Sequence, residues 1–216
     1  MTPDALFTNR ANYWIGLALD LCVSIIVIAV GGARCASLVG LLAGIAAGAA
    51  TFTLYEYALH RWLYHGRSNK VAALHRWHHR EPDLLVGAPL YFSLGVTALN
   101  WLPAAWLVDA AFASVFAGTI LFCYAQQSVI HHAAHNWPHS HGVAARSALR
   151  RHHLRHHHAG DGNFGISTVF WDYVFATRLP ARPRGAPALT RPVARRARRP
   201  PPRRGDTRPA SCRSSA

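Results

Sequence analysis

The chain has 216 residues, of which 51% are hydrophobic and only 15% are charged, and its formal net charge is +14. This length fits one domain, and the charge alone would suggest a nucleic-acid-binding protein. The distribution of the charge argues against that class, because eleven arginines and a single acidic residue, Asp206, lie between Pro180 and Ala216. That proline-rich segment has too few large apolar residues to fold. We therefore predict one domain over 1–179, a disordered tail over 180–216, and no specific nucleic-acid partner.

Two long apolar stretches come first, at residues 14–30 and 36–59, and each carries a single charged residue. Each is close to the roughly 17–25 residues that a membrane-spanning helix needs. A third apolar block, 84–130, is too long for one span, and Asn100 and Pro103 predict a break inside it. We predict helices over about 84–100 and 104–130. The fold class is therefore all-α and integral to a membrane, with four transmembrane helices arranged as two hairpins.

Basic residues predict the orientation of these spans. The segments 60–80 and 131–158 are rich in arginine, whereas the link between the first two spans has only Arg34. By the positive-inside rule, both basic segments and both termini lie on the cytoplasmic side of a multi-pass protein. All fifteen histidines fall in these two segments. The histidines are thus predicted to share one face of the membrane.

The histidines occur in four motifs with metal-ligand spacing. The H-x2-H-H triplets at 75–79 and 153–157 are expected to aim three imidazoles at one point, and the H-x3-H motif at 131–135 aims two. The H-x4-H motif at 60–65 differs, because residues i and i+5 point about 140° apart on an ideal helix. Those two rings converge only if the helix ends between them, and Gly66 is a plausible stop. The ten candidate ligands are His60, His65, His75, His78, His79, His131, His135, His153, His156 and His157.

Ten imidazoles are too many for one ion and suit two ions with four or five each, which leaves coordination positions for water or dioxygen. Imidazole binds iron, zinc, copper and nickel, so the ligand type does not choose the metal. We expect four nearby carboxylates to hold ring nitrogens of the ligands. These are Glu56, Glu81, Asp83 and Asp161. Among the five remaining histidines, His132, His139, His152 and His158 are expected to support the ligands or replace one of them, and His141 to be solvated or to support them.

The four motifs together resemble the pattern of the integral-membrane fatty acid hydroxylase and sterol desaturase superfamily. The stretches "EYALHRWLYH" at 56–65 and "NFGISTVFWDYVFAT" at 163–177 are similar to segments of the fatty acid 2-hydroxylases. The resemblance covers about residues 50–178. It implies a cytosolic helical cap that holds two iron ions, with zinc as a substitute. It further implies dioxygen-dependent hydroxylation of a lipid acyl chain, a membrane lipid as substrate, and a separate electron donor, either a ferredoxin or a b-type cytochrome with its reductase.

Two other functions stay open at this point. A sterol or carotenoid hydroxylase or desaturase of the same superfamily would use the same ligand set. A membrane metal-binding or transport protein would instead need polar ligands inside the spans. The spans offer few of these, chiefly Asp20, Glu56, Gln126 and Gln127.

Overall fold

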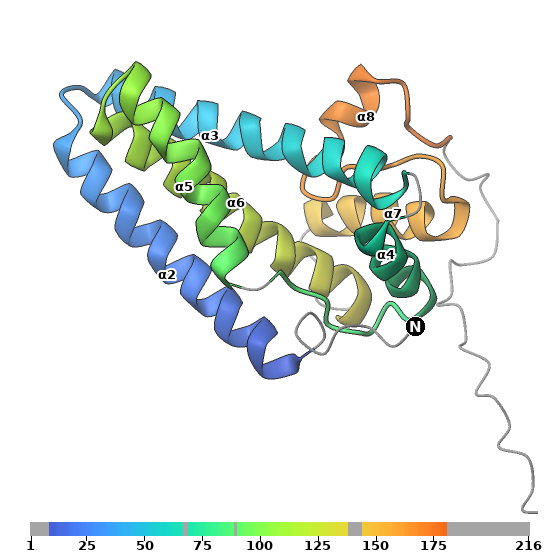
Figure 1. Cartoon of the computed structure of the whole chain (residues 1–216). Coiled ribbons are helices and arrows are strands. Elements are labelled where there is room, and N and C mark those ends of the chain that lie inside the picture. Colours follow the sequence, from blue (N-terminus) through green and yellow to red (C-terminus); the bar gives the residue numbers. More distant parts are fainter. Residues whose placement is uncertain (1–8, 67–68, 89, 138–143, 181–216) are drawn as a thin grey trace, which may run out of the picture.

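The computed structural model describes residues 9–66, 69–88, 90–137 and 144–180 (Figure 1). Every regular element in these ranges is a helix, so the predicted all-α class is confirmed for this part of the chain. The helices are α2 (Arg10–Arg34), α3 (Leu38–Ala58), the π-helix η1 (Leu59–Tyr64), α4 (Lys70–Arg80), α5 (Leu90–Leu107), α6 (Ala110–Asn136), α7 (Ala144–Ala159) and α8 (Phe170–Val174). The predicted disordered tail lies outside the described residues.

Helix α6 is the centre of a bundle and packs against α2, α3 and α5. Its buried residues are mostly small, among them Ala113, Ala117 and Gly118, so the neighbouring helices approach it closely. Large apolar side chains face outward instead, and Val39 is 77% exposed. Outward-facing apolar surface of this kind is expected of helices that contact lipid. Helices α4, α7 and α8, which we call the cap, gather at one end of the bundle (Figure 1).

Within the described ranges, three helical stretches are long and apolar enough to cross a membrane, namely α2, α3 with η1, and α6. This supports a membrane protein and part of the predicted topology. Helix α5 has 18 residues and is not among the three. Its assignment as a fourth span remains a prediction.

The predicted break at Asn100 and Pro103 is wrong, because α5 runs through both residues to Leu107. A proline in a helix removes one hydrogen bond, a loss that packing against neighbouring helices tolerates in apolar bundles. The chain turns instead at Asp109, whose carboxylate accepts a hydrogen bond from the backbone N–H of Phe112 at 2.7 Å. That contact is an N-cap for α6. A capping aspartate therefore marks the turn, and the proline does not.

Glycines of α3 bring this helix into close contact with α6. A Cβ added to Gly48 would lie 2.6 Å from the carbonyl oxygen of Phe116 and 2.8 Å from Cβ of Thr119. We expect Gly48→Ala to push the two helices apart and to lower the free energy of unfolding by about 1–3 kcal/mol. Gly95→Ala is the matched control, because its added Cβ meets nothing within 4 Å. Thermal unfolding of both variants in one detergent tests this, and equal midpoints would contradict it.

Candidate metal centre

The structure brings the ten candidate ligands together in two groups of five. In each group, one ligand atom from every histidine lies within 4.8 Å of the others. The first cluster is His60, His65, His75, His79 and His156, and the second cluster is His78, His131, His135, His153 and His157. Both clusters combine residues from the bundle with residues from the cap.

The expectation that each triplet aims at one point is wrong. His75 and His79 of α4 belong to the first cluster, whereas His78 belongs to the second. On α7 the division is reversed, because His153 and His157 join the second cluster and His156 joins the first. The reason is helical geometry: positions i and i+4 lie close together around the axis, whereas i+3 and i+4 are successive residues about 100° apart. Each triplet thus contributes to both clusters.

The Nε2 atoms of the first cluster converge closely. The Nε2 atom of His75 lies 2.9 Å from that of His65, 3.1 Å from that of His60 and 3.0 Å from that of His79. The Nε2 atom of His156 lies 3.0 Å from that of His65 and 3.2 Å from that of His79. Nitrogens about 2.1 Å from one metal would be about 3.0 Å apart at right angles and about 3.4 Å apart in a tetrahedron. The first cluster therefore fits an ion with near-right-angle ligands better than a tetrahedral one.

The second cluster contains buried nitrogens that have no hydrogen-bond partner among the described residues. These are both ring nitrogens of His78, Nδ1 of His153 and Nε2 of His157. The Nε2 atoms of His135 and His153 also lie 2.9 Å apart. An unpartnered buried polar group costs about 1–3 kcal/mol, so an arrangement with several of them needs a compensating ligand. A bound cation would provide that compensation, and the residues fit one.

Burial keeps the cap histidines in the form that binds metals. It lowers the pKa of His79 to about 4, with a smaller contribution from His65. Burial also lowers the pKa values of His75, His78 and His157, and neighbouring histidines lower them further. The neutral imidazole, with a free lone pair, is the ligating form. These rings are therefore neutral at neutral pH, with one ring N–H and one free lone pair each, before any ion binds.

His60 and His65 converge by a different route from the one predicted. The α-helix gives way before them to η1, which ends at Tyr64, and the backbone N–H of His65 donates to the carbonyl of His60 at 3.2 Å. A π turn places residues i and i+5 one hydrogen-bonded turn apart, and the two ring centroids are 5.2 Å apart. The chain leaves the helix at Gly66, where a Cβ would collide with the carbonyl oxygen of Trp62. Gly66 is thus a stop after the pair.

Backbone carbonyls of the loop between α7 and α8 orient two of the rings. This segment, Gly160–Val169, is called the 160–169 loop. The Nδ1 atom of His60 lies 2.5 Å from the carbonyl oxygen of Phe164, and Nδ1 of His156 lies 2.8 Å from that of Gly162. A carbonyl only accepts, so the proton sits on Nδ1 and the lone pair of Nε2 faces the cluster. The loop therefore sets the tautomer of both histidines.

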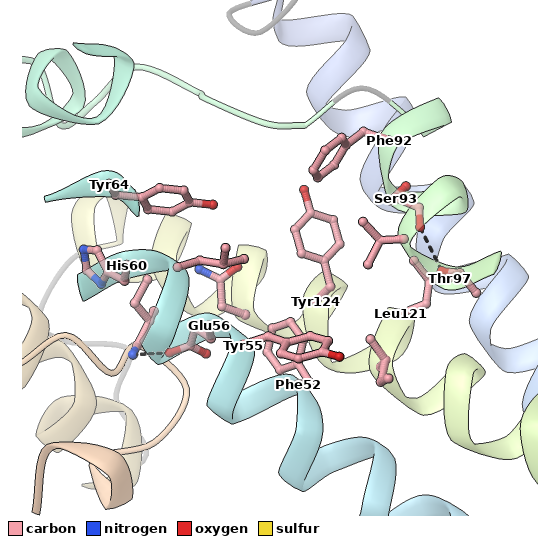
Figure 2. Close-up of a pocket in the computed structure, with 15 residues that line it drawn as sticks. Phe52, Tyr55, Glu56, His60, Tyr64, Phe92, Ser93, Thr97, Leu121 and Tyr124 are labelled. Carbon is pink, nitrogen blue, oxygen red and sulfur yellow. Dashed lines mark hydrogen bonds between the residues drawn. The ribbon is translucent and has the colours of Figure 1, made fainter. Parts of the chain in front are cut away.

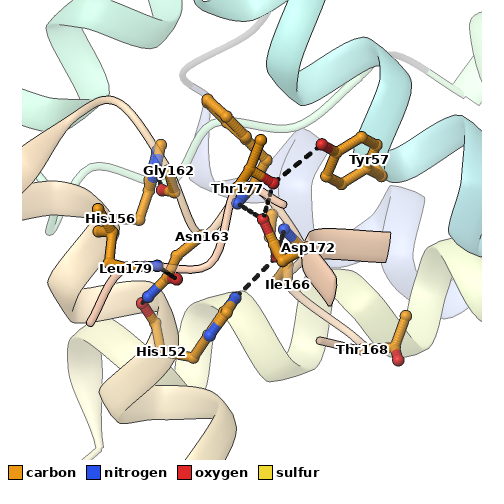
Figure 3. Close-up of polar contacts among 12 residues, drawn as sticks. Tyr57, His152, His156, Gly162, Asn163, Ile166, Thr168, Asp172, Thr177 and Leu179 are labelled. Carbon is orange, nitrogen blue, oxygen red and sulfur yellow. Dashed lines mark hydrogen bonds and ion pairs between the residues drawn. The ribbon is translucent and has the colours of Figure 1, made fainter. Parts of the chain in front are cut away.

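Two buried carboxylates hold the 160–169 loop in place. Asp172 accepts from the backbone N–H groups of Phe164 and Gly165, each at 2.8 Å, and lies 2.9 Å from Nε2 of His152 (Figure 3). Burial raises the pKa of this carboxyl, but these hydrogen bonds and one from Thr177 outweigh burial, so its pKa is below the usual value. Sequence reasoning did not select Asp172. Its only signal was its place inside the stretch at 163–177.

Glu56 is the second carboxylate, and it does not hold a ring nitrogen as predicted. It accepts hydrogen bonds from the backbone N–H groups of Ile166 and Ser167 and from the Ser167 hydroxyl. The other three carboxylates expected in this role, Glu81, Asp83 and Asp161, have exposed side chains. Loop amides, rather than imidazoles, are therefore the partners of Glu56.

We expect Glu56→Ala to release the 160–169 loop, because it leaves two buried backbone N–H groups unpaired at about 1–3 kcal/mol each. Glu56→Gln is the matched control, since its amide oxygen can still accept from both N–H groups and its amide nitrogen can donate to the Ser167 hydroxyl. Thermal unfolding and the metal content of the purified protein measure the difference. Equal loss in both variants would show that the charge, rather than the accepted bonds, is what matters.

Three of the other histidines are described by the structure and lie outside both clusters. His152 is buried against Asp172 and its backbone carbonyl accepts from Nδ2 of Asn163 at 3.0 Å, so it supports the loop. His132 is half-buried, and its ring centroid lies 5.1 Å from that of Trp14. His158 is exposed. His139 and His141 are outside the described residues.

A cavity adjoins the first cluster within the bundle. It has about 120 Å³ of free space, where about 10–15 Å³ is enough for one water. Figure 2 shows His60 and Tyr64 near one end and Thr97 and Leu121 toward the other, with Tyr124 between. Most of the lining is apolar, while Glu56, His60 and Tyr64 present polar groups at one end and Ser93 and Thr97 present hydroxyl groups toward the other. Such a cavity suits a chain-like apolar molecule with a polar group near the histidines.

Comparison with known proteins identifies the family. The fatty acid hydroxylase family model matches residues 45–177. A dihydroceramide fatty acyl 2-hydroxylase of Arabidopsis thaliana is 31% identical over 188 residues, covering 79% of this chain and 75% of the plant protein. The fatty acid 2-hydroxylase of Homo sapiens is 31% identical over 144 residues, covering 61% of this chain but only 38% of the human protein.

A solved structure agrees with these sequence matches. It is described as full-length Scs7p with only the hydroxylase domain visible, and it superposes with a TM-score of 0.65 at 25% identity. The match covers 78% of this chain and 67% of that one. By sequence and by fold, this chain belongs to the fatty acid hydroxylase family.

Proposed function

We propose that this protein is a membrane-bound, dioxygen-dependent hydroxylase that adds a hydroxyl group to a lipid acyl chain, at the carbon next to the carbonyl. The observation that carries the proposal is the position of His60, which belongs to a cluster of five histidines and also lines the apolar cavity. The relatives are named as fatty acyl 2-hydroxylases, which favours an acyl substrate over a sterol or carotenoid and favours position 2.

The ten clustered histidines are the proposed ligands of two iron ions, with zinc able to occupy the same sites. When bound, the metal pair would supply the oxidant for an unactivated C–H bond, which no side chain provides. The near-right-angle spacing of the first cluster supports iron over a tetrahedral zinc site. The 160–169 loop keeps the Nε2 lone pairs of His60 and His156 directed at the cluster.

The cavity residues would bind the substrate. Phe52 and Leu121 would contact the acyl chain, and the hydroxyl groups of Tyr64 and Tyr124 would lie near its polar end. A cavity that begins at a cluster and extends into the bundle lets the chain enter from the bilayer without crossing water. The position that the acyl chain takes in this cavity would determine which of its carbons faces the metals.

We further propose that α5 is the fourth span, and that the cap and both termini are cytoplasmic. Eighteen residues at 1.5 Å per residue give about 27 Å, close to the hydrocarbon thickness of a bilayer. The electron donor would be a separate ferredoxin, or a b-type cytochrome with its reductase. Arg76, Arg80 and Arg151 are exposed on the cap and could attract an acidic donor.

Reconstitution tests the function directly. The purified protein, loaded with iron, is placed in vesicles containing ceramide together with a reducing donor system and isotopically labelled dioxygen. We expect 2-hydroxyacyl lipid that carries the label, and no product from the His156→Ala variant. Product on added sterol or carotenoid alone, or labelled lipid from the variant as well, would contradict the proposal.

A further inference from the structure

An exposed apolar surface lies beside the metal centre, and apart from Leu59, which also lines the cavity, its side chains take no part in the proposed reaction. Side chains of η1, of α8 and of the residue directly after α8 form it, and we call it the aromatic patch. Its members are Leu59, Trp62, Phe170, Tyr173, Val174 and Phe175, which are between 39% and 57% exposed. A soluble surface rarely concentrates so many large apolar side chains without a partner.

Helix α8 and Phe175, which follows it, carry most of the aromatic patch, and their contacts place them along α3 in a candidate membrane span. The indole Nε1 of Trp171 donates to Oγ1 of Thr53 at 3.1 Å, and the ring of Phe175 stacks on that of Tyr57 with centroids 5.1 Å apart. Thr53 lies seven residues before His60, which is about 10 Å along a helix toward the bundle interior. Figure 1 shows α8 on the outer side of α3. The patch therefore continues the outward-facing apolar surface of a candidate span.

Two arginines flank the aromatic patch. The guanidinium of Arg178 lies 4.5 Å from the ring centroid of Tyr173, and that of Arg61 lies 5.3 Å from the ring of Trp62. Tyrosine and tryptophan favour the boundary between hydrocarbon and headgroups, and arginines beside them reach lipid phosphates from there. Large apolar rings with basic flanks match a bilayer surface in charge and in polarity.

We propose that α8 and the aromatic patch insert into the bilayer at the end of α3 that carries His60, as an interfacial anchor of the cap. The partner is the boundary of hydrocarbon and phosphate headgroups in that leaflet. The opposite side of α8 carries Asp172, which holds the 160–169 loop. The anchor would therefore fix the loop, and with it the cap, against the membrane. This inference concerns lipid contact and is independent of the hydroxylation proposed above.

Site-directed spin labelling in vesicles tests the depth of the patch. Labels are placed singly at Phe170→Cys and Val174→Cys in a chain whose native cysteines are replaced. Ile26→Cys, exposed on a candidate span, is the lipid reference, and Arg76→Cys, exposed on α4, is the aqueous reference. We expect relaxation by dioxygen to exceed relaxation by a water-soluble nickel chelate at both test positions, as at Ile26. Values matching those at Arg76 would overturn the proposal.

A second measurement keeps the native cysteines. A benzophenone amino acid replaces Tyr173 in one preparation and Arg76 in another, and both are irradiated in vesicles of phosphatidylcholine and phosphatidylserine. We expect lipid adducts at position 173, detected by mass spectrometry, and far fewer lipid adducts at position 76. Crosslinks at 173 to a second copy of the chain, or to other parts of the same chain, would overturn the proposal.

Discussion

Replacing His156 by alanine should abolish product formation and remove metal from the first cluster, while His78→Ala should do the same at the second cluster. Each substitution deletes one of five convergent nitrogens. Loss of even an outer partner of a metal ligand costs about 10–100-fold in metal affinity, so loss of a ligand should cost at least that. Elemental analysis of each purified variant, beside its hydroxylated lipid product, measures the effect.

His158→Ala provides the matched control for these two variants. His158 lies on the same helix as His156 and is exposed outside both clusters. It should keep the metal content and the product yield of the unmodified protein. Full activity in His156→Ala, or an equal loss in His158→Ala, would reject the assignment of ligands.

Replacing Asp172 by asparagine should destabilise the cap although Asp172 touches neither cluster. Each carboxylate oxygen accepts from one backbone N–H group of the 160–169 loop. An asparagine presents its NH2 to one of them, which leaves a buried donor unpaired at about 1–3 kcal/mol. The loop also sets the tautomers of His60 and His156. We therefore expect a lower unfolding midpoint together with a loss of metal affinity of about 10–100-fold.

The destabilisation caused by Asp172→Asn should depend on pH in a defined direction. The pKa of Asp172 is lower in the folded protein than usual, so its carboxylate stabilises the fold above the unfolded pKa of about 3.9. That stabilisation is lost as pH falls through the lower folded pKa. The difference in unfolding free energy between the protein and Asp172→Asn should be constant from neutral pH to about pH 4 and shrink below it. A difference that grew on acidification would contradict the role of the carboxylate.

Local sequence patterns predicted much of this protein. Apolar runs indicated the long helices, and the i, i+4 spacings indicated the pairs of histidines that share a cluster. His131 and His135, four residues apart on α6, lie in one cluster as their spacing suggests. Patterns of this kind act over one or two turns, where helical geometry fixes the outcome.

Features that depend on distant parts of the chain were not predicted. The carbonyl of Phe164 meets His60 across 104 residues, and the amide of Ile166 meets Glu56 across 110 residues. No spacing rule connects such positions, and backbone carbonyls leave no mark in the sequence. The π turn at His65 also escaped prediction, because a change from α to π winding follows from tertiary packing.

Helices α4 and α7 each supply histidines to both clusters, which would couple the binding of one ion to the binding of the other. An ion in either cluster fixes the rotation and position of the same two helices, and so organises part of the other cluster before its own ion arrives. The entropy of ordering these helices is lost once, on the first binding event. Metal uptake by the empty protein should accordingly be cooperative, and singly loaded molecules should be scarce during titration.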